Sequence, residues 1–97
     1  MGSPSSNKGT GSVVATGGAI DVRAFGFRPK TVKLHQGGVS LEWQEGMASD
    51  SAYKRLANGT GTFVAAGGVT PLVDGFTIGA DADLNATGQT IRWEASE

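Results

Sequence analysis

The sequence predicts an all-β protein, a small antiparallel β-sandwich or barrel with an extended N-terminal arm. Apolar and polar residues alternate with a period of two in several short segments, which is typical of strands with one buried face. These segments recur at about the 8–12-residue spacing of sandwiches and barrels. The 97 residues also include 16 glycines, well above the usual ~7 %, and this turn-rich composition favours short strands over helices.

Residues 1–12 are expected to form the arm and residues 13–97 a single β domain. The first dozen residues are almost entirely Gly, Ser, Thr, Asn and Pro, so they bury too little apolar surface to offset the entropy of ordering. We therefore expect this segment to lie on a partner subunit or a neighbouring copy. An arm that adds to the sheet edge of a neighbour gains main-chain hydrogen bonds whatever its side chains are.

The first strands are expected over residues 12–16 and 18–23, next to a glycine pair. The clearest hairpin follows, because two alternating segments at residues 30–36 and 39–45 are joined by the pair at 37 and 38. The alternation predicts that Val32, Leu34, Val39, Leu41 and Trp43 point inward.

The second half of the chain continues the same pattern. Strands are expected over residues 62–66 and 69–73, again separated by a glycine pair, and over residues 90–95. Residues 48–56 are the only helical candidate and could equally form an edge strand. The predicted core consists of Leu41, Trp43, Phe63, Phe76, Ile78 and Trp93.

Composition and charge exclude several classes of function. A formal net charge of −1 with scattered Lys and Arg argues against nucleic acid and against an anionic membrane surface. No apolar segment approaches the ~20 residues of a membrane span, and no signal peptide is evident. The absence of cysteine excludes disulfides and cysteine nucleophiles. We expect a protein that is made in the cytoplasm and needs no cofactor.

The segment with Asp81, Asp83 and Asn85 has the acidic spacing that opens a calcium loop. It departs from that loop because Ala86 replaces the turn glycine and Arg92 replaces the closing glutamate. These departures favour a polar loop, in which Asp and Asn oxygens accept hydrogen bonds from nearby backbone N–H groups.

His35 is the only histidine and so the only side chain whose ordinary pKa suits general base catalysis near neutrality. A triad would also need a nucleophile and an orienting carboxylate, and no nucleophile elbow is present. We expect a surface or interface histidine. Glycosylation triplets begin at Asn58 and Asn85, but Asn58 and Gly59 together favour a turn in which φ is positive.

Four short motifs occur in a distinctive order along the chain. They are FGFRPKTV at residues 25–32, LEWQEGM at 41–47, GFTIGADADLN at 75–85 and IRWEA at 91–95. In this order the motifs resemble a group of small virion proteins of tailed bacteriophages. The resemblance covers most of residues 20–95 and leaves out the N-terminal arm.

The resemblance implies an all-β fold on the outside of a phage head or at a tail tip, as a decoration protein or a fibre module. We expect a non-enzymatic decoration protein bound to the major capsid protein. Such proteins usually stand on symmetry axes, so a homo-oligomer is expected, a trimer more readily than a dimer. The residues expected to contact the capsid or a neighbouring subunit are Ser3, Pro4, Ser5, Asn7, Lys8, Thr10, Val13 and Val14.

A receptor-binding or carbohydrate-binding module of a tail or head fibre is the alternative. Such a module would use exposed aromatic side chains as stacking platforms. Because the alternation directs both tryptophans inward, the candidates for this role are Phe25, Phe27 and Tyr53. An enzyme would need a convergent polar site that the sequence does not indicate.

Overall fold

The computed structural model describes residues 8–23 and 27–97, and in this part of the chain all eight strands belong to one antiparallel sheet. The strands are β1 (Lys8–Val14), β2 (Ile20–Val22), β3 (Thr31–Gln36), β4 (Val39–Gln44), β5 (Ser51–Arg55), β6 (Gly61–Leu72), β7 (Gly75–Ile78) and β8 (Thr90–Ser96). Their order in the sheet is β1-β8-β3-β4-β5-β6-β7-β2. The all-β prediction is therefore confirmed.

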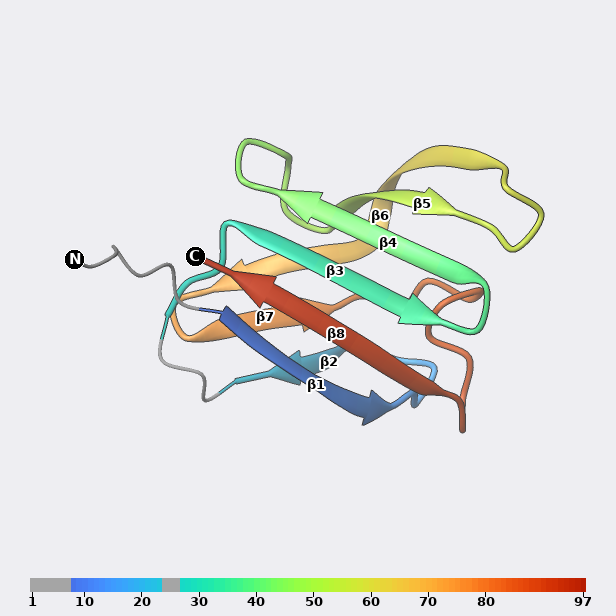
Figure 1. Cartoon of the computed structure of the whole chain (residues 1–97), viewed down its shortest axis with the longest axis horizontal. Helices are drawn as coiled ribbons and strands as arrows, with labels where there is room; N and C mark the ends of the chain where they lie inside the picture. Colours follow the sequence, from blue (N-terminus) through green and yellow to red (C-terminus); the bar gives the residue numbers. More distant parts are fainter. Residues whose placement is uncertain (1–7, 24–26) are drawn as a thin grey trace.

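The sheet curls back on itself, so that β1, β8, β3 and β4 lie in front of β7 and β2 (Figure 1). Phe76 on β7 and Trp93 on β8 meet edge to face with ring centroids 5.5 Å apart, although the two strands are not neighbours in the sheet. The result is a half-barrel made by a single sheet. It is closer to an open barrel than to a sandwich of two sheets.

The hairpin of β3 and β4 forms where the alternation predicts it. Gln36 pairs with Val39 across a two-residue turn, and Gly37 takes the positive φ of 59° that this turn requires. Val32 and Leu34 are fully buried. The other buried apolar side chains of the core include Val22, Leu41, Trp43, Ala52, Val69, Phe76, Ile78, Leu84, Ile91 and Ala95.

The two strands predicted over residues 62–66 and 69–73 form one long strand, β6, which ends at Leu72. Gly67 has a φ of 81°, and the pairing with β5 shifts abruptly, so that Ser51 pairs with Val69 but Ala52 pairs with Val64. A Cβ on Gly68 would lie 2.3 Å from the Ser51 carbonyl oxygen. The glycine pair therefore bends the strand and lets two backbones approach closely, instead of reversing the chain.

Residues 8–12, predicted as part of a separate arm, pair with β8 of their own sheet. Ser3, Pro4, Ser5 and Asn7 lie outside the described residues. Within β1, Gly11 faces Trp93, and a Cβ on this glycine would lie 2.7 Å from the indole Cζ2 atom. A strand with few apolar side chains can dock here because the large ring of its neighbour covers the glycine.

The segment proposed as a helix or an edge strand is β5, which lies in the interior of the sheet between β4 and β6. Asp50 precedes it with a φ of 68°. The Ala48 carbonyl oxygen accepts hydrogen bonds from Trp43 Nε1 and from the Ser51 hydroxyl, at 3.1 and 2.6 Å. These contacts fix the connection from β4 to β5.

One buried asparagine ties the connection of β1 and β2 to the connection of β7 and β8. Asn85 Oδ1 accepts hydrogen bonds from the backbone N–H groups of Thr16 and Gly17, each at 3.1 Å. Its Nδ2 donates to the carbonyl oxygens of Gly18 and Gly79, at 2.6 and 3.0 Å. The loop that the sequence offered as a cation site therefore holds the two edges of the curled sheet together.

Candidate binding surface

The sheet face opposite the core, here called the outer face, is formed by alternate residues of β1, β8, β3, β4, β5 and β6. Residues that pair directly across antiparallel strands lie on the same face, so this face contains continuous rows of side chains. One row runs Ser12, Arg92, His35, Ser40 and Arg55, and the adjacent row runs Thr10, Glu94, Lys33, Glu42, Tyr53 and Phe63.

The outer face is more positive than the rest of the molecule. It contains four cations and two carboxylates, namely Lys8, Lys33, Arg55, Arg92, Glu42 and Glu94. The net charge of the face is therefore +2, whereas the formal net charge of the whole chain is −1. All ion pairs between described residues involve Arg23 or Lys54, so these four cations form none. Their charges remain available to a ligand.

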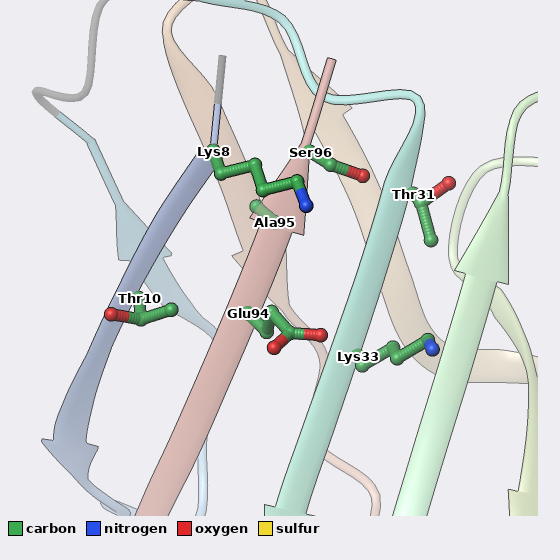
Figure 2. Close-up of a pocket in the computed structure, with 7 residues that line it drawn as sticks. All are labelled: Lys8, Thr10, Thr31, Lys33, Glu94, Ala95 and Ser96. Carbon is green, nitrogen blue, oxygen red and sulfur yellow. The ribbon is translucent and has the colours of Figure 1, made fainter. Parts of the chain in front are cut away.

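Two shallow hollows lie on this face. The first, of about 250 Å³, is lined by residues of β1, β8 and β3. Figure 2 shows the side chain of Lys8 lying across β8 toward β3, with Glu94 and Lys33 in the same hollow. The second, of about 290 Å³, is lined by Ser40, Glu42, Tyr53 and Arg55.

Two neighbouring aromatic side chains mark one end of the outer face. Tyr53 and Phe63 pair directly across β5 and β6, and each is 57 % exposed. The Tyr53 ring lies over Gly61, where a Cβ would come within 3.3 Å of its Cε1 atom. Tyr53 is thus where the sequence predicted an exposed aromatic, whereas Phe63, predicted in the core, is exposed beside it.

The other two aromatic candidates do not contribute to this surface in the described structure. Phe27, proposed as an outer recognition residue, is only 7 % exposed. Phe25 lies outside the described residues. Phe63 was predicted in the core because it is aromatic. A usable signal was the alternation with Val64, which packs against the core and so directs Phe63 to the opposite face.

The residues of β1 proposed as partner contacts fall on two faces. Lys8, Thr10 and Val14 are exposed, and Val14 has 61 % of its surface accessible. Val13 is half-buried and packs against the core. Of these four residues, Lys8, Thr10 and Val14 are therefore placed to contact a partner, and Val13 is not.

Asp81 and Asp83, considered as metal ligands, bind the side chain of Lys54 instead. The Lys54 ammonium donates to Asp81 Oδ1 at 2.9 Å and to Asp83 Oδ2 at 2.5 Å. Asp81 Oδ2 also accepts hydrogen bonds from the N–H groups of Asp83 and Leu84, as predicted for a polar loop. Within residues 8–23 and 27–97, no three His, Cys, Asp or Glu side chains gather as a metal site requires.

The Lys54 side chain is nine-tenths buried. Burial alone lowers the pKa of the ammonium, but the hydrogen bonds and charges of Asp83 and Asp81 outweigh it and raise the pKa above 10.5. Because the pKa is higher in the folded than in the unfolded state, the contact contributes its full stability at any pH below the pKa of the unfolded state. This stability is lost as the pH rises through the pKa of the folded state.

Replacing Lys54 with methionine is expected to destabilise the fold by about 2–3 kcal/mol at pH 7, because the Asp81 carboxylate stays buried without its cation. Urea denaturation measures this difference. The difference should shrink as the pH rises past 10.5 and through the raised pKa of the folded state, where the wild-type lysine loses its proton. Lys33→Met, on the exposed outer face, is the control and should change stability by less than about 0.5 kcal/mol. Equal losses for the two variants would contradict the prediction.

The remaining sequence candidates occupy structural positions. His35 is exposed on β3 between Arg92 and Ser40, in agreement with a surface histidine. Asn58 accepts a hydrogen bond from Thr60 N–H at 2.9 Å, and Gly59 has the predicted positive φ, here 90°. Asn85 is 2 % exposed, so its side chain is inaccessible to a glycosylating enzyme in the folded protein.

Comparison with protein-family models, curated proteins and solved structures found no match to this chain. The described part of the chain contains no helix long and apolar enough to cross a membrane. The features that bear on function are therefore the outer face, the sheet edges and the four sequence motifs.

Proposed function

We propose that this protein is a non-enzymatic structural protein of a bacteriophage particle, a decoration protein that binds the major capsid protein on the outside of the head. It is made in the host cytoplasm and joins the particle there. The order of the four sequence motifs, which resembles that of small virion proteins of tailed bacteriophages, supports this proposal. The structural observation that carries the proposal is the open edge of β1, which offers a means of attachment.

β1 is the edge strand best suited to bind another chain. It is seven residues long, and among the described strands only β8 pairs with it. The opposite edge, β2, has three residues and is flanked by charged contacts of Arg23 with Asp21 and Asp74. Short, charged edges resist strand addition, so β1 is the edge that a partner would extend.

The hydrogen-bonding direction of β1 follows from one bond at its end. Ala15 N–H donates to the Gln89 carbonyl oxygen at 2.8 Å, which continues the register of β1 with β8. Alternation then directs the N–H groups of Gly11 and Val13 toward β8, and those of Thr10 and Ser12 away from the sheet. A capsid strand, or β1 of a second copy in a dimer or trimer, would pair with these outward groups.

Proline at position 12 tests this attachment without disturbing the pairing of β1 with β8, because it removes an outward N–H and suits an edge strand. We expect full-length protein to co-sediment saturably with mature phage heads, and Ser12→Pro to reduce binding roughly tenfold or more. Ser12→Ala is the matched control and should bind like the wild type. Deletion of residues 1–7 measures the contribution of the preceding segment while keeping all of β1.

The outcomes separate attachment from folding. Circular dichroism and the urea midpoint of Ser12→Pro should match those of Ser12→Ala. If a folded Ser12→Pro protein binds heads as well as the control, the β1 edge is not the attachment site. If the full-length protein binds no heads, mature or immature, the assignment as a decoration protein is wrong.

A further inference from the structure

The outer face combines three properties that the proposed attachment through β1 does not use. It has exposed aromatic rings at one end, unpaired cations along its length and hydroxyl groups between them. The aromatic pair is Tyr53 and Phe63. The cations that belong to the two rows are Lys33, Arg55 and Arg92. We propose that the outer face binds a carboxylate-bearing polysaccharide, a chain of acidic sugar units, lying across the strands.

The shape of the face requires an extended ligand. Each hollow is smaller than the about 300–1,000 Å³ of sites that enclose a small molecule. The two hollows lie over different strands, one on β1, β8 and β3 and the other on β4 and β5. At about 4.8 Å between neighbouring strands, β8 and β5 are about 14 Å apart. A single sugar unit is too short to reach both, so the ligand is an oligomer.

The aromatic end favours a sugar ring. A pyranose has an apolar face of C–H groups, which stacks on an exposed aromatic side chain, and polar edges that need hydrogen bonds. Tyr53 lines the second hollow together with Ser40, Glu42 and Arg55. A ring on Tyr53 therefore has a hydroxyl, a carboxylate and a guanidinium beside it.

The charge of the face favours acidic sugars over neutral ones. In the first row Arg92, His35, Ser40 and Arg55 are consecutive partners, so one guanidinium group stands on either side of His35 and Ser40. Neither guanidinium forms an ion pair among the described residues. Arginine binds carboxylates with two parallel hydrogen bonds, which gives the row both affinity and orientation. Carboxylates spaced along a sugar chain would meet these two positions.

The same observations disfavour single-stranded nucleic acid, the other polymer that combines charge and ring stacking. Such strands stack successive bases on aromatic side chains distributed along a basic groove. Here the exposed aromatics of the described residues, Tyr53 and Phe63, adjoin at one end of the face. Successive bases would therefore find no further stacking platform along its length.

Isothermal titration calorimetry with polygalacturonate oligosaccharide and with its methyl ester tests the proposal, because the two probes have the same sugar and differ in charge. We expect the acid to bind and its affinity to fall when salt is raised from about 0.01 to 0.15 M. Arg55→Gln should weaken binding of the acid roughly tenfold and flatten its salt dependence. Tyr53→Ala should weaken it roughly tenfold at either salt concentration.

Two controls remove an exposed cation and an exposed apolar side chain that lie off the outer face. Lys30→Gln removes an exposed cation that precedes β3, and Val73→Ala trims a side chain that is 79 % exposed in the turn between β6 and β7. Both should bind like the wild type. A loss with Lys30→Gln equal to that with Arg55→Gln would show only diffuse charge attraction and would overturn the site.

Three other results of the titrations would overturn the proposal. Equal affinity for the methyl ester would overturn the acidic assignment, and tighter binding of a dT oligonucleotide would assign the face to nucleic acid instead. No binding of polygalacturonate would overturn the proposal. Because the test variants lie on β5, away from the β1 edge, failure here leaves head binding unaffected, and failure of head binding leaves this site intact.

Discussion

Replacing Asn85 with alanine is expected to destabilise the protein by about 3–4 kcal/mol, because a buried side chain is lost and four backbone groups lose their hydrogen-bond partner. Water can reach the exposed residues Thr16, Gly17 and Gly18, but Gly79 is buried. Urea denaturation followed by circular dichroism gives the difference. Asn58→Ala is the matched control, since Asn58 makes one exposed hydrogen bond in a turn, and it should cost less than about 1 kcal/mol.

Aspartate at position 85 separates hydrogen bonding from packing. Asn85→Asp keeps the acceptor for Thr16 and Gly17 but replaces the donor to Gly18 and Gly79 with an oxygen that faces two carbonyl groups. The folded state then raises the pKa of this carboxyl, so the variant should be less stable than wild type at pH 7 and regain stability relative to it as the pH falls. A deficit independent of pH would show that the four hydrogen bonds are not responsible.

Replacing Trp43 with alanine is the second change with a large expected effect. Trp43 is 3 % exposed, so the substitution removes a large core side chain and costs about 3–5 kcal/mol. Native proteins have a total stability of only about 5–15 kcal/mol, so the variant should melt roughly 10–40 °C below the wild type. Thermal denaturation by circular dichroism measures the loss.

Two further variants, Trp43→Phe and Tyr53→Ala, serve as controls for the stability loss of Trp43→Ala. Trp43→Phe keeps an aromatic ring but loses the indole N–H that donates to Ala48, and it should cost about 1–2 kcal/mol. The exposed Tyr53 can be truncated at a cost below about 1 kcal/mol. If Trp43→Ala were no less stable than Tyr53→Ala, the core assignment of Trp43 would be wrong.

Local signals in the sequence were sufficient for the β3 and β4 hairpin and for most of the core. Val32, Leu34 and Leu41 alternate with polar residues around a Gly-Gly turn, and each of these features acts within a few residues. The same reasoning failed at Gly67 and Gly68, because a glycine pair reverses a chain or bends a strand according to which other backbone lies against it. That neighbour, Ser51, is distant in the sequence.

Two assignments depended on pairing that no local pattern reveals. Phe63 was placed in the core because it is aromatic, but its partner Tyr53 faces outward and register decides the face. Residues 8–12 were treated as an arm because they are polar and small, yet they dock under Trp93, which lies more than 80 residues away in the chain. The rows of the outer face follow from the same long-range pairing, so the sequence could name single exposed residues such as Tyr53, His35 and Thr10 but not their arrangement in rows.

The position of β8 between β1 and β3 determines when this protein can fold. β8 follows the other seven described strands in the chain, yet it supplies the neighbour that both β1 and β3 require. Until β8 has been synthesised, β1 lacks the only described strand that pairs with it. Pairing between strands so distant in the sequence makes contact order high and folding slow. The nascent chain must therefore keep the edges of β1 and β3 from pairing with other chains until β8 emerges.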